Sequence, residues 1–457
     1  MAIDAPLTYG QLSTWRSMET FAADRLMEVN VPATWDVRGL TTDAVLGALG
    51  RLAQRHESLR TTYHVVADQP VQRIHDQLPL RIEHVDRAVP DPADPAATLR
   101  ELHQLPFPVL DDPGWHGRLV SVAGQPQFLA LSLSHMVVDL WAIQELEEQF
   151  RAIVADPGAS SAPAPRSREL AVVQRGDSWQ SRRRRAETYW RRLLTDGPVR
   201  NLPDPPTGRA AERRIQATLR SHHLAVLVAQ AAKAHSVSQQ SVVMAATAVA
   251  LAQFVDRDRI MMSLMSANRF DPEWQPLIGT LNQLVPLVCR VDADTPLAQY
   301  LKRTHFNAML AYRSGCYDVD RAEELAKEIG SPDGVRFEHD CWFNYIAEPP
   351  REVPDDVRSA GTAELSWDTP PRNAGHPFYA RVHGDGQHWI GVTLRVDPDV
   401  LSADAVVRAL RVIAETVRRS VTDPQALLGS LDDAGTVVPA PMLFPDQVPP
   451  PADPAER

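Results

Sequence analysis

The chain has 457 residues and a mass of 50.7 kDa, which exceeds one ordinary hydrophobic core, so two domains are expected. A formal net charge of -11 and a sequence pI near 5.8 disfavour a nucleic-acid partner. The mean hydropathy of -0.26, without any long uninterrupted apolar stretch, argues against a membrane span. The first residues have no basic region followed by an apolar segment, so no signal peptide is expected and a cytoplasmic location follows.

Cysteine usage agrees with this location. Cys289, Cys316 and Cys341 are widely separated and lack the paired spacing of metal ligands. We therefore expect free thiols in a reducing compartment rather than disulfides or a zinc site. His222 and His223 have no nearby cysteine or second histidine pair, so a metal site is not expected there either.

The first half of the chain shows strand and helix patterns up to about residue 155. Segment 156–166 is rich in Pro, Ala and Ser and breaks every period, which predicts a crossover. A helical segment is expected over 168–194. A second Pro-rich segment, 201–208, follows it, and the two linkers bracket the expected region between the domains.

In the second half, the pattern at 238–254 predicts a buried helix rich in Val, Ala and Met, and the pattern at 259–265 predicts a strand. Loops are expected at 348–356 and at 366–376. The last segment, 437–457, is rich in Pro and acidic residues and is expected to be disordered.

One junction carries most of the functional information. Alternating leucines at 129, 131 and 133 predict a strand that ends at Ser134 and His135, and a helical pattern begins just after Asp139. A neutral imidazole at such a junction can accept a proton from an attacking amine or hydroxyl. The alternative is a structural histidine beside a strand, with Asp139 as an ordinary helix N-cap.

The segment SHMVVDLW at 134–141 resembles the core motif of the condensation-domain superfamily of nonribosomal peptide synthetases, which is written His-His-x3-Asp-Gly and is followed by Trp. The other similar segments occur in the family's order and extend over roughly residues 6 to 430. They are LTYGQLSTW at 7–15, RHESLRTTY at 55–63, YWRRLL at 189–194, SANR at 266–269, IGTLNQLVP at 278–286 and WFNY at 342–345.

The resemblance implies an α/β fold of two chloramphenicol-acetyltransferase-like lobes that form a V-shaped pseudo-dimer around a central channel. We expect the N-terminal lobe at 1–175, the C-terminal lobe at 176–435 and a disordered tail at 436–457. His135 corresponds to the histidine credited with catalysis in the family. Asp139 corresponds to an aspartate that pairs with an arginine, for which Arg269 is the candidate.

Two departures from the motif bear on activity. Ser134 replaces the first histidine, and a hydroxyl can supply one of the hydrogen bonds of an imidazole but not two. Leu140 replaces the glycine, and any positive φ there would be strained. Trp141 has the helical spacing of the core face and is expected to pack there. The candidates for the substrate channel are Leu140, Trp141, Asn282, Trp342 and Asn344, although Asn282, Trp342 and Asn344 also suit ordinary buried positions.

Two functions follow from the resemblance. The first is a condensation-type acyltransferase, which joins an acyl or aminoacyl thioester on a carrier protein to an amine or hydroxyl of a small acceptor. An acyl-CoA in place of the carrier protein stays open as the donor. The second is a catalytically silent module that binds a carrier protein or recruits a tailoring enzyme. Met1 and the tail favour a free-standing protein, and a monomer is expected. No metal, membrane or nucleic-acid partner and no intrinsic cofactor is expected, and phosphopantetheine arrives with the carrier protein.

A block of arginines at 182–185 has two interpretations. It is either a solvated helix face or a docking patch for an acidic, phosphate-bearing carrier protein, which the family implies as partner.

Overall fold

The computed structural model divides into two compact units that are interleaved along the chain. Unit 1 comprises 1–187, 267–283 and 316–322, and unit 2 comprises 188–266, 284–315 and 323–457. The described residues are 2–20, 26, 29–92, 94–105, 113–156, 163–198, 200–203, 214–329, 339–348, 363–368, 370 and 376–431. The expected tail at 437–457 lies outside these ranges, as do most of the crossover at 156–166, most of the linker at 201–208 and most of the loop at 348–356.

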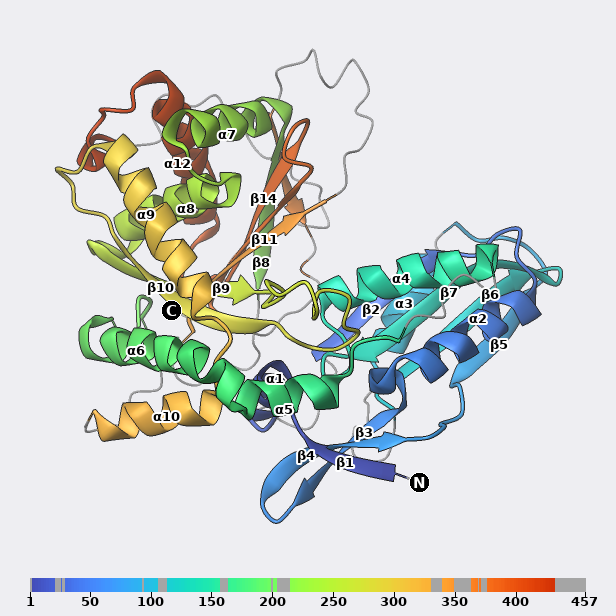
Figure 1. Ribbon diagram of the computed structural model, residues 1–457. Coiled ribbons are helices and arrows are strands. Elements are labelled where there is room, and N and C mark those ends of the chain that lie inside the picture. The colour runs from blue at the N-terminus through green and yellow to red at the C-terminus, as the bar shows by residue number, and fades with distance from the viewer. Residues whose placement is uncertain are drawn as a thin grey trace, which may run out of the picture. The chain divides into compact units, whose positions relative to one another are not determined.

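Unit 1 contains a mixed four-stranded sheet with the order β2-β7-β6-β5 (Figure 1). Only the pairing of β5 with β6 is parallel. A second, antiparallel sheet has the order β1-β4-β3. The strands are β1 (Ala2–Pro6), β2 (Asn30–Asp36), β3 (Thr61–Val66), β4 (Gln69–His75), β5 (Ile82–Arg87), β6 (Trp115–Val122) and β7 (Gln125–Ser134).

Helices cover both faces of the four-stranded sheet because β7 is apolar on both sides. Leu129, Leu131 and Leu133 pack in one core with residues of α2 and α4, whereas Phe128 and Ala130 pack in another with Leu102 of α3. Successive side chains of a strand point to opposite faces, which produces this alternation. The helices that begin in unit 1 are α1 (Tyr9–Met18), α2 (Thr42–Arg55), α3 (Asp94–His103), α4 (Leu140–Ala155), α5 (Ser167–Arg175), α6 (Gln180–Asp196) and α10 (Val319–Glu328), with short 3-10 turns at Glu57–Arg60 and Asp177–Trp179.

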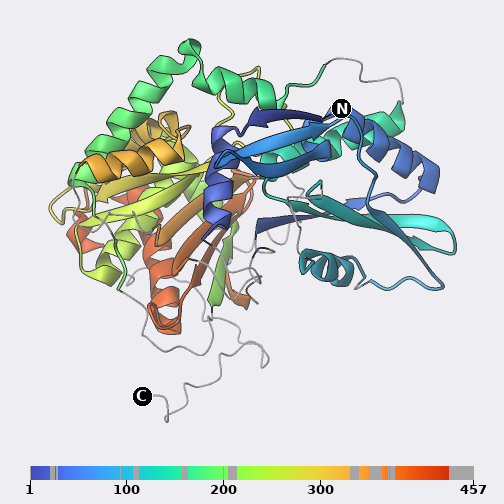
Figure 2. The ribbon, with the colours of Figure 1, turned by 90° about the horizontal axis from the view of Figure 1, so that it is seen from below.

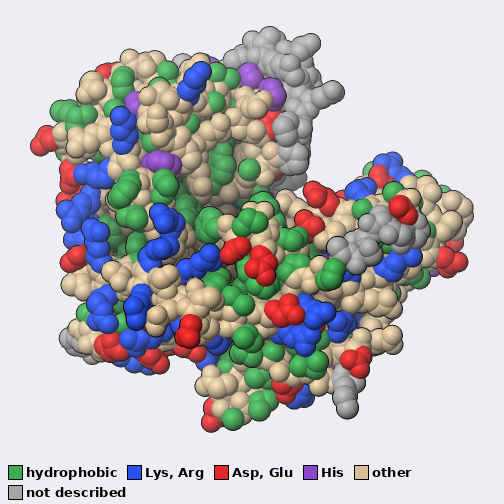
Figure 3. Space-filling model, in the orientation of Figure 1, with side chains coloured by type: hydrophobic (Ala, Val, Ile, Leu, Met, Phe, Trp, Pro, Cys, Tyr) green, Lys and Arg blue, Asp and Glu red, His purple; other side chains and the backbone are tan. Residues whose placement is uncertain are grey.

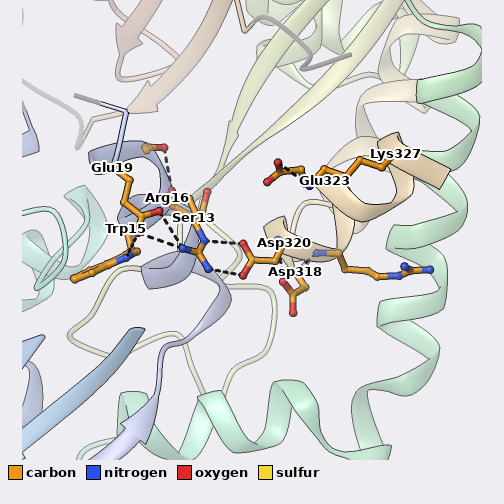
Figure 4. Close-up of polar contacts among 10 residues, drawn as sticks. Ser13, Trp15, Arg16, Glu19, Asp318, Asp320, Glu323 and Lys327 are labelled. Carbon is orange, nitrogen blue, oxygen red and sulfur yellow. Dashed lines mark hydrogen bonds and ion pairs between the residues drawn. The ribbon is translucent and has the colours of Figure 1, made fainter. Parts of the chain in front are cut away.

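Two contacts explain why segments distant in sequence belong to unit 1. Arg16 of α1 makes a bidentate ion pair with Asp320, at 2.8 and 2.9 Å, and also contacts Glu19 (Figure 4). Gln283 donates to the carbonyl of Tyr317 at 2.8 Å. The structure therefore groups 176–187, 267–283 and 316–322 with the first unit, whereas the predicted boundary at 175 assigns them to the second lobe.

Unit 2 is built on a seven-stranded mixed sheet with the order β10-β9-β11-β13-β14-β8-β12, and its helices gather on one face of that sheet (Figures 1 and 2). The strands are β8 (Ile215–Ser221), β9 (Arg259–Ser266), β10 (Gln283–Arg290), β11 (Cys341–Ala347), β12 (Ala363–Asp368), β13 (Phe378–Gly384) and β14 (Ile390–Val396). The helices are α7 (His222–His235), α8 (Gln239–Val255), α9 (Leu297–Arg313) and α12 (Ala403–Thr422), with a 3-10 turn at Leu428–Ser430.

Several predicted elements of this half can be compared directly with the structure. The buried helix at 238–254 is confirmed as α8, in which every residue from 241 to 252 is buried, and the strand at 259–265 is confirmed as β9. The predicted loop at 366–376 is wrong at its start, because 366–368 are the last residues of β12. The backbone of β12 pairs with β8, a partner that the local sequence does not reveal.

Among the described residues, no helix is long and apolar enough to cross a membrane. Within the same part of the chain, no three His, Cys, Asp or Glu side chains lie together in a way that could hold a metal ion.

The turn between β6 and β7 offers a test of backbone strain. Ala123 and Gly124 connect paired residues Val122 and Gln125, and both have positive φ, 49° and 76°. This is the geometry of a type I′ turn, in which Asn-Gly is preferred and an alanine at the first position is strained.

Replacing exposed Ala123 by asparagine should raise the free energy of unfolding by about 0.5 to 1 kcal/mol, because asparagine tolerates the left-handed conformation. Thermal and denaturant unfolding would measure the change. Ala123→Val is the control and should lower stability, since a β-branched residue is strained there. Equal stability of the two variants would contradict the turn geometry.

Candidate active site

The predicted strand-to-helix junction is confirmed. Strand β7 ends at Ser134, helix α4 begins at Leu140, and the five residues between them form a tight connection, called here the His135 loop (135–139). Asp139 is the N-cap of α4 and accepts a hydrogen bond from the backbone N–H of Ala142 at 2.8 Å. The local sequence therefore determines where the helix begins.

Ser134 supports the His135 loop from the end of the strand. Its side chain is buried, and its hydroxyl accepts a hydrogen bond from the N–H of Met136 at 3.3 Å. Its carbonyl accepts from the N–H groups of Val137 and Val138, at 2.9 and 3.3 Å. Gly114 lies against this turn with φ of +70°, and a Cβ there would come within 2.8 Å of Val137. The loop therefore closes around a serine, although the family motif has a histidine at this position.

His135 is held through its backbone on both sides. Its N–H donates to the carbonyl of Val29 at 2.9 Å, and its carbonyl accepts a hydrogen bond from the hydroxyl of Thr280. The side chain is half-buried. A fixed backbone with a partly accessible imidazole is the arrangement that a positioned general base requires.

Tyr63 and Gln11 extend this support into the core of unit 1. The Tyr63 hydroxyl donates to the carbonyl of Met136 at 2.7 Å, and Gln11 donates to the Tyr63 oxygen at 3.4 Å. Burial raises the pKa of Tyr63 well above its usual value, so the phenol stays protonated as a donor. Gly10 approaches closely as well, because a Cβ there would lie 2.4 Å from the carbonyl oxygen of Thr280.

Asp139 forms a buried ion pair with Arg269. The distance from Nη2 to Oδ1 is 2.7 Å, and the two side chains are 3% and 4% exposed. The second carboxylate oxygen of Asp139 accepts from the N–H of Leu281 at 3.1 Å. The pairing that the family resemblance implies is therefore present in the structure. It connects the His135 loop to a segment more than 100 residues away.

Arg269 also organises the segment that follows it. Its guanidinium donates to the carbonyls of Gln275 and Leu277, at 2.9 and 2.8 Å, and to that of Gly279 at 3.0 Å. Asn268 adopts a left-handed conformation with φ of 54°, and its side chain donates to the carbonyl of Leu281 at 2.9 Å. Asparagine tolerates this conformation better than most residues, which explains the Asn-Arg sequence.

Replacing Arg269 by methionine should lower the free energy of unfolding by about 3 to 5 kcal/mol, because it leaves the Asp139 carboxylate buried without its cation. Urea unfolding would measure the loss. The control is Arg151→Met, which removes an exposed pair with Glu147 within α4 and should change stability by less than about 1 kcal/mol. Similar effects of the two substitutions would show that the buried pair contributes no more to the free energy of unfolding than the exposed pair.

The residues proposed for a channel fall into two groups. Leu140 and Trp141 lie at the start of α4 and are 42% and 50% exposed. The expectation that Trp141 packs on the core face is wrong, because the buried positions of α4 begin one residue later, at Ala142. Asn282 is half-buried in unit 1, directly after Leu281.

Trp342 and Asn344 belong to unit 2, on strand β11. The Trp342 ring stacks on His376 with a centroid distance of 3.7 Å and meets the edge of Tyr379. Asn344 donates to the Tyr379 hydroxyl at 3.3 Å. These contacts place both residues in one aromatic cluster, and their role in substrate binding stays a prediction.

His56 has a structural position. It is buried at the end of α2, and its Nε2–H donates to Oε1 of Gln149 at 2.8 Å. Burial lowers the pKa of His56 to about 4, from an ordinary value of 6.5. Between these two pH values the unfolded chain binds a proton that the folded chain excludes, so His56 reduces stability as the pH falls.

The free energy of unfolding should therefore fall by about 2 kcal/mol more in the unmodified protein than in His56→Gln when the pH is lowered from 7.5 to 5. Urea titrations of both proteins at both pH values would measure this difference. An identical pH dependence in the two proteins would show that folding does not lower the pKa of His56.

Tyr63, Thr280 and Gln11 also belong to the site, although the sequence alone does not assign them to it. All three lie in segments that resemble family motifs, and this resemblance is the only sign in the sequence that they could belong to the site. Their contacts with the His135 loop come from tertiary structure. The geometry defines an α/β protein with a rigidly held histidine at the end of a strand, supported by a buried carboxylate-arginine pair.

Comparisons with known proteins agree with this class. The family model "Condensation domain" matches residues 17–356, and the chain belongs to that family. The nonribosomal peptide synthetase kk1B of Curvularia clavata is 26% identical over 318 residues, which are 64% of this chain and 2% of that protein. This and similar curated relatives are much longer than the matched region, and the chain spans between 2% and 12% of their length.

Solved structures show the same fold. One is the complex of the X-domain and OxyB from teicoplanin biosynthesis, with a TM-score of 0.74, 20% identity, and coverage of 94% of this chain and 96% of that chain. Another, on condensation domain-mediated chain release from the enacyloxin polyketide synthase, has a TM-score of 0.70, 20% identity, and coverage of 92% and 83%. The expectation of a mixed α/β condensation-domain fold is confirmed.

Proposed function

We propose that this protein is a condensation-type acyltransferase, which forms an amide or ester bond between a carrier-protein-tethered acyl or aminoacyl thioester and an amine or hydroxyl acceptor. The observation that supports this most is the immobilised backbone of His135 with its half-buried side chain. The proposal includes the two-lobed arrangement around a shared channel that the family resemblance implies, and a cytoplasmic, monomeric protein without a cofactor of its own.

The chemistry demands little beyond positioning. A thioester is already activated, so the acceptor's nitrogen or oxygen attacks the carbonyl carbon while His135 removes the acceptor's proton. The tetrahedral intermediate then collapses, the C–S bond breaks, and the pantetheine thiolate leaves and takes up a proton. Asp139 and Arg269 neutralise each other in the interior, so their contribution is to fix the loop rather than to carry protons.

The two departures from the family motif are compatible with this activity. The Ser134 hydroxyl bonds the loop backbone at Met136, so the turn closes without the first histidine. Leu140 is the first residue of α4, where right-handed helical backbone suits any residue, and its side chain extends into solvent. Neither substitution strains the His135 loop.

A second function is a silent module that recruits another enzyme. Likeness to the X-domain, whose solved structure is a complex with OxyB, favours this alternative, as does the loss of the first histidine at Ser134. The two functions differ in whether the His135 side chain is needed.

The deciding experiment is intact-mass spectrometry of acyl-loaded carrier proteins mixed with candidate amines and alcohols. His135→Ala should reduce the rate of acyl transfer by about 10²-fold to 10⁴-fold, because it removes the base. The matched control His84→Ala, which removes an exposed histidine of β5, should transfer at the rate of the unmodified protein.

Equal transfer by His135→Ala and the unmodified protein would contradict the catalytic role. Binding of the carrier protein without transfer to any acceptor, unaffected by His135→Ala, would instead support the recruitment module.

A further inference from the structure

Helix α9 in unit 2 has an outer face that is unusual for an exposed helix. Its inner face is formed by buried residues at helical spacing, among them Leu297, Leu301, Ala308 and Ala311. The opposite face of an amphipathic surface helix is normally polar. In α9 this face instead carries three large apolar side chains, spaced so that they lie next to one another on the helix surface. They are Phe306, Met309 and Leu310, which are 62%, 48% and 36% exposed.

Cationic side chains border this apolar group along the helix. Lys302 lies one turn before Phe306 and Arg313 lies one turn after Met309, and both are exposed. Arg303 is held beside them through Asp292 and the carbonyl of Arg290. Figure 3 shows hydrophobic side chains over α9 with Lys and Arg side chains beside them.

The charge of α9 differs in sign from that of the whole chain. The helix sequence LAQYLKRTHFNAMLAYR contains one lysine, two arginines and no acidic residue, whereas the chain has a net charge of -11. An apolar centre of Phe and Met with a charged rim is the composition of a protein interface rather than of a solvated surface. The positive rim selects an acidic partner.

We infer that the outer face of α9, defined by Lys302, Phe306, Met309, Leu310 and Arg313, is a docking surface for an acidic helical carrier protein. This inference rests on the proposed function for the identity of the partner. It differs from the alternative raised by the sequence, in which the arginine block of α6 receives the carrier. In α6, the guanidinium of Arg183 already donates hydrogen bonds to the carbonyls of Gln174 and Gly176 within the protein.

The contact should be weak and sensitive to salt. Three apolar side chains form a small patch, which suits a partner that must bind and leave in every cycle. The cationic rim increases the rate of encounter with an acidic surface, and added salt screens that attraction. Phe306 lies centrally among the cations and is expected to contribute most to affinity.

The test is biolayer interferometry of the full chain against a panel of carrier proteins that carry phosphopantetheine without an acyl group, so that binding is measured without chemistry. The double variant Phe306→Ser with Arg313→Glu should weaken the Kd at least 10-fold. Two matched controls should stay within twofold of the unmodified protein. They are Val172→Ser, which removes an exposed apolar side chain of α5, and Arg185→Glu, which reverses an exposed charge of α6.

A weaker Kd in the α9 variant alone, with an unchanged melting temperature, supports the docking surface. An unchanged Kd in that variant, loss of binding in Arg185→Glu instead, or no binding of any carrier to the unmodified chain would overturn it. The proposed function is tested separately by acyl transfer. Transfer with a Kd insensitive to α9 rejects the surface only, and α9-dependent binding without transfer rejects the enzyme only.

Discussion

The carboxylate of Asp139 is the constraint on which the rest of the site depends. It caps α4 through one oxygen, which also receives Arg269, and its other oxygen accepts the N–H of Leu281. A buried charge with these three partners has few alternative conformations, because losing any of them leaves a charge or an N–H group unsatisfied in the interior. One side chain therefore positions the end of the His135 loop, the start of a helix and a distant segment.

His135 lies in the loop that Asp139 holds in place, and its own backbone is also hydrogen-bonded. Its backbone is hydrogen-bonded to Val29 and Thr280, and the backbone of the next residue is hydrogen-bonded to Tyr63, so elements from three parts of the chain fix the backbone that carries the imidazole. Catalysis by proximity requires such a positioned group. These contacts are present although Ser134 replaces the first histidine of the motif. The departure from the family pattern therefore does not disrupt the loop.

Helix α9 of unit 2 is positively charged, although the whole chain has a net charge of -11. Helix α9 carries one lysine, two arginines and no carboxylate, and it combines these charges with exposed Phe306 and Met309. In the proposed function the thioester donor is a carrier protein, and the face of α9 would bind that donor.

The amino-acid sequence by itself determined the local elements of this protein. The buried helix α8, strand β9, the end of β7 and the Asp139 cap follow from patterns within a few residues, since hydrophobic period and capping are local properties. The pairing of Asp139 with Arg269 was expected only from family resemblance, because nothing in either local pattern identifies a partner 130 residues away.

Tertiary structure alone decided which distant segments meet. It placed Thr280 and Tyr63 on the His135 loop, assigned 316–322 to the first unit, turned Trp141 toward solvent and made the start of a predicted loop into the edge strand β12. These outcomes depend on how the folded chain packs its surfaces and pairs its backbone groups. A local pattern predicts that a segment will be a strand or a helix face, but the contact it makes depends on the partner that the fold brings to it.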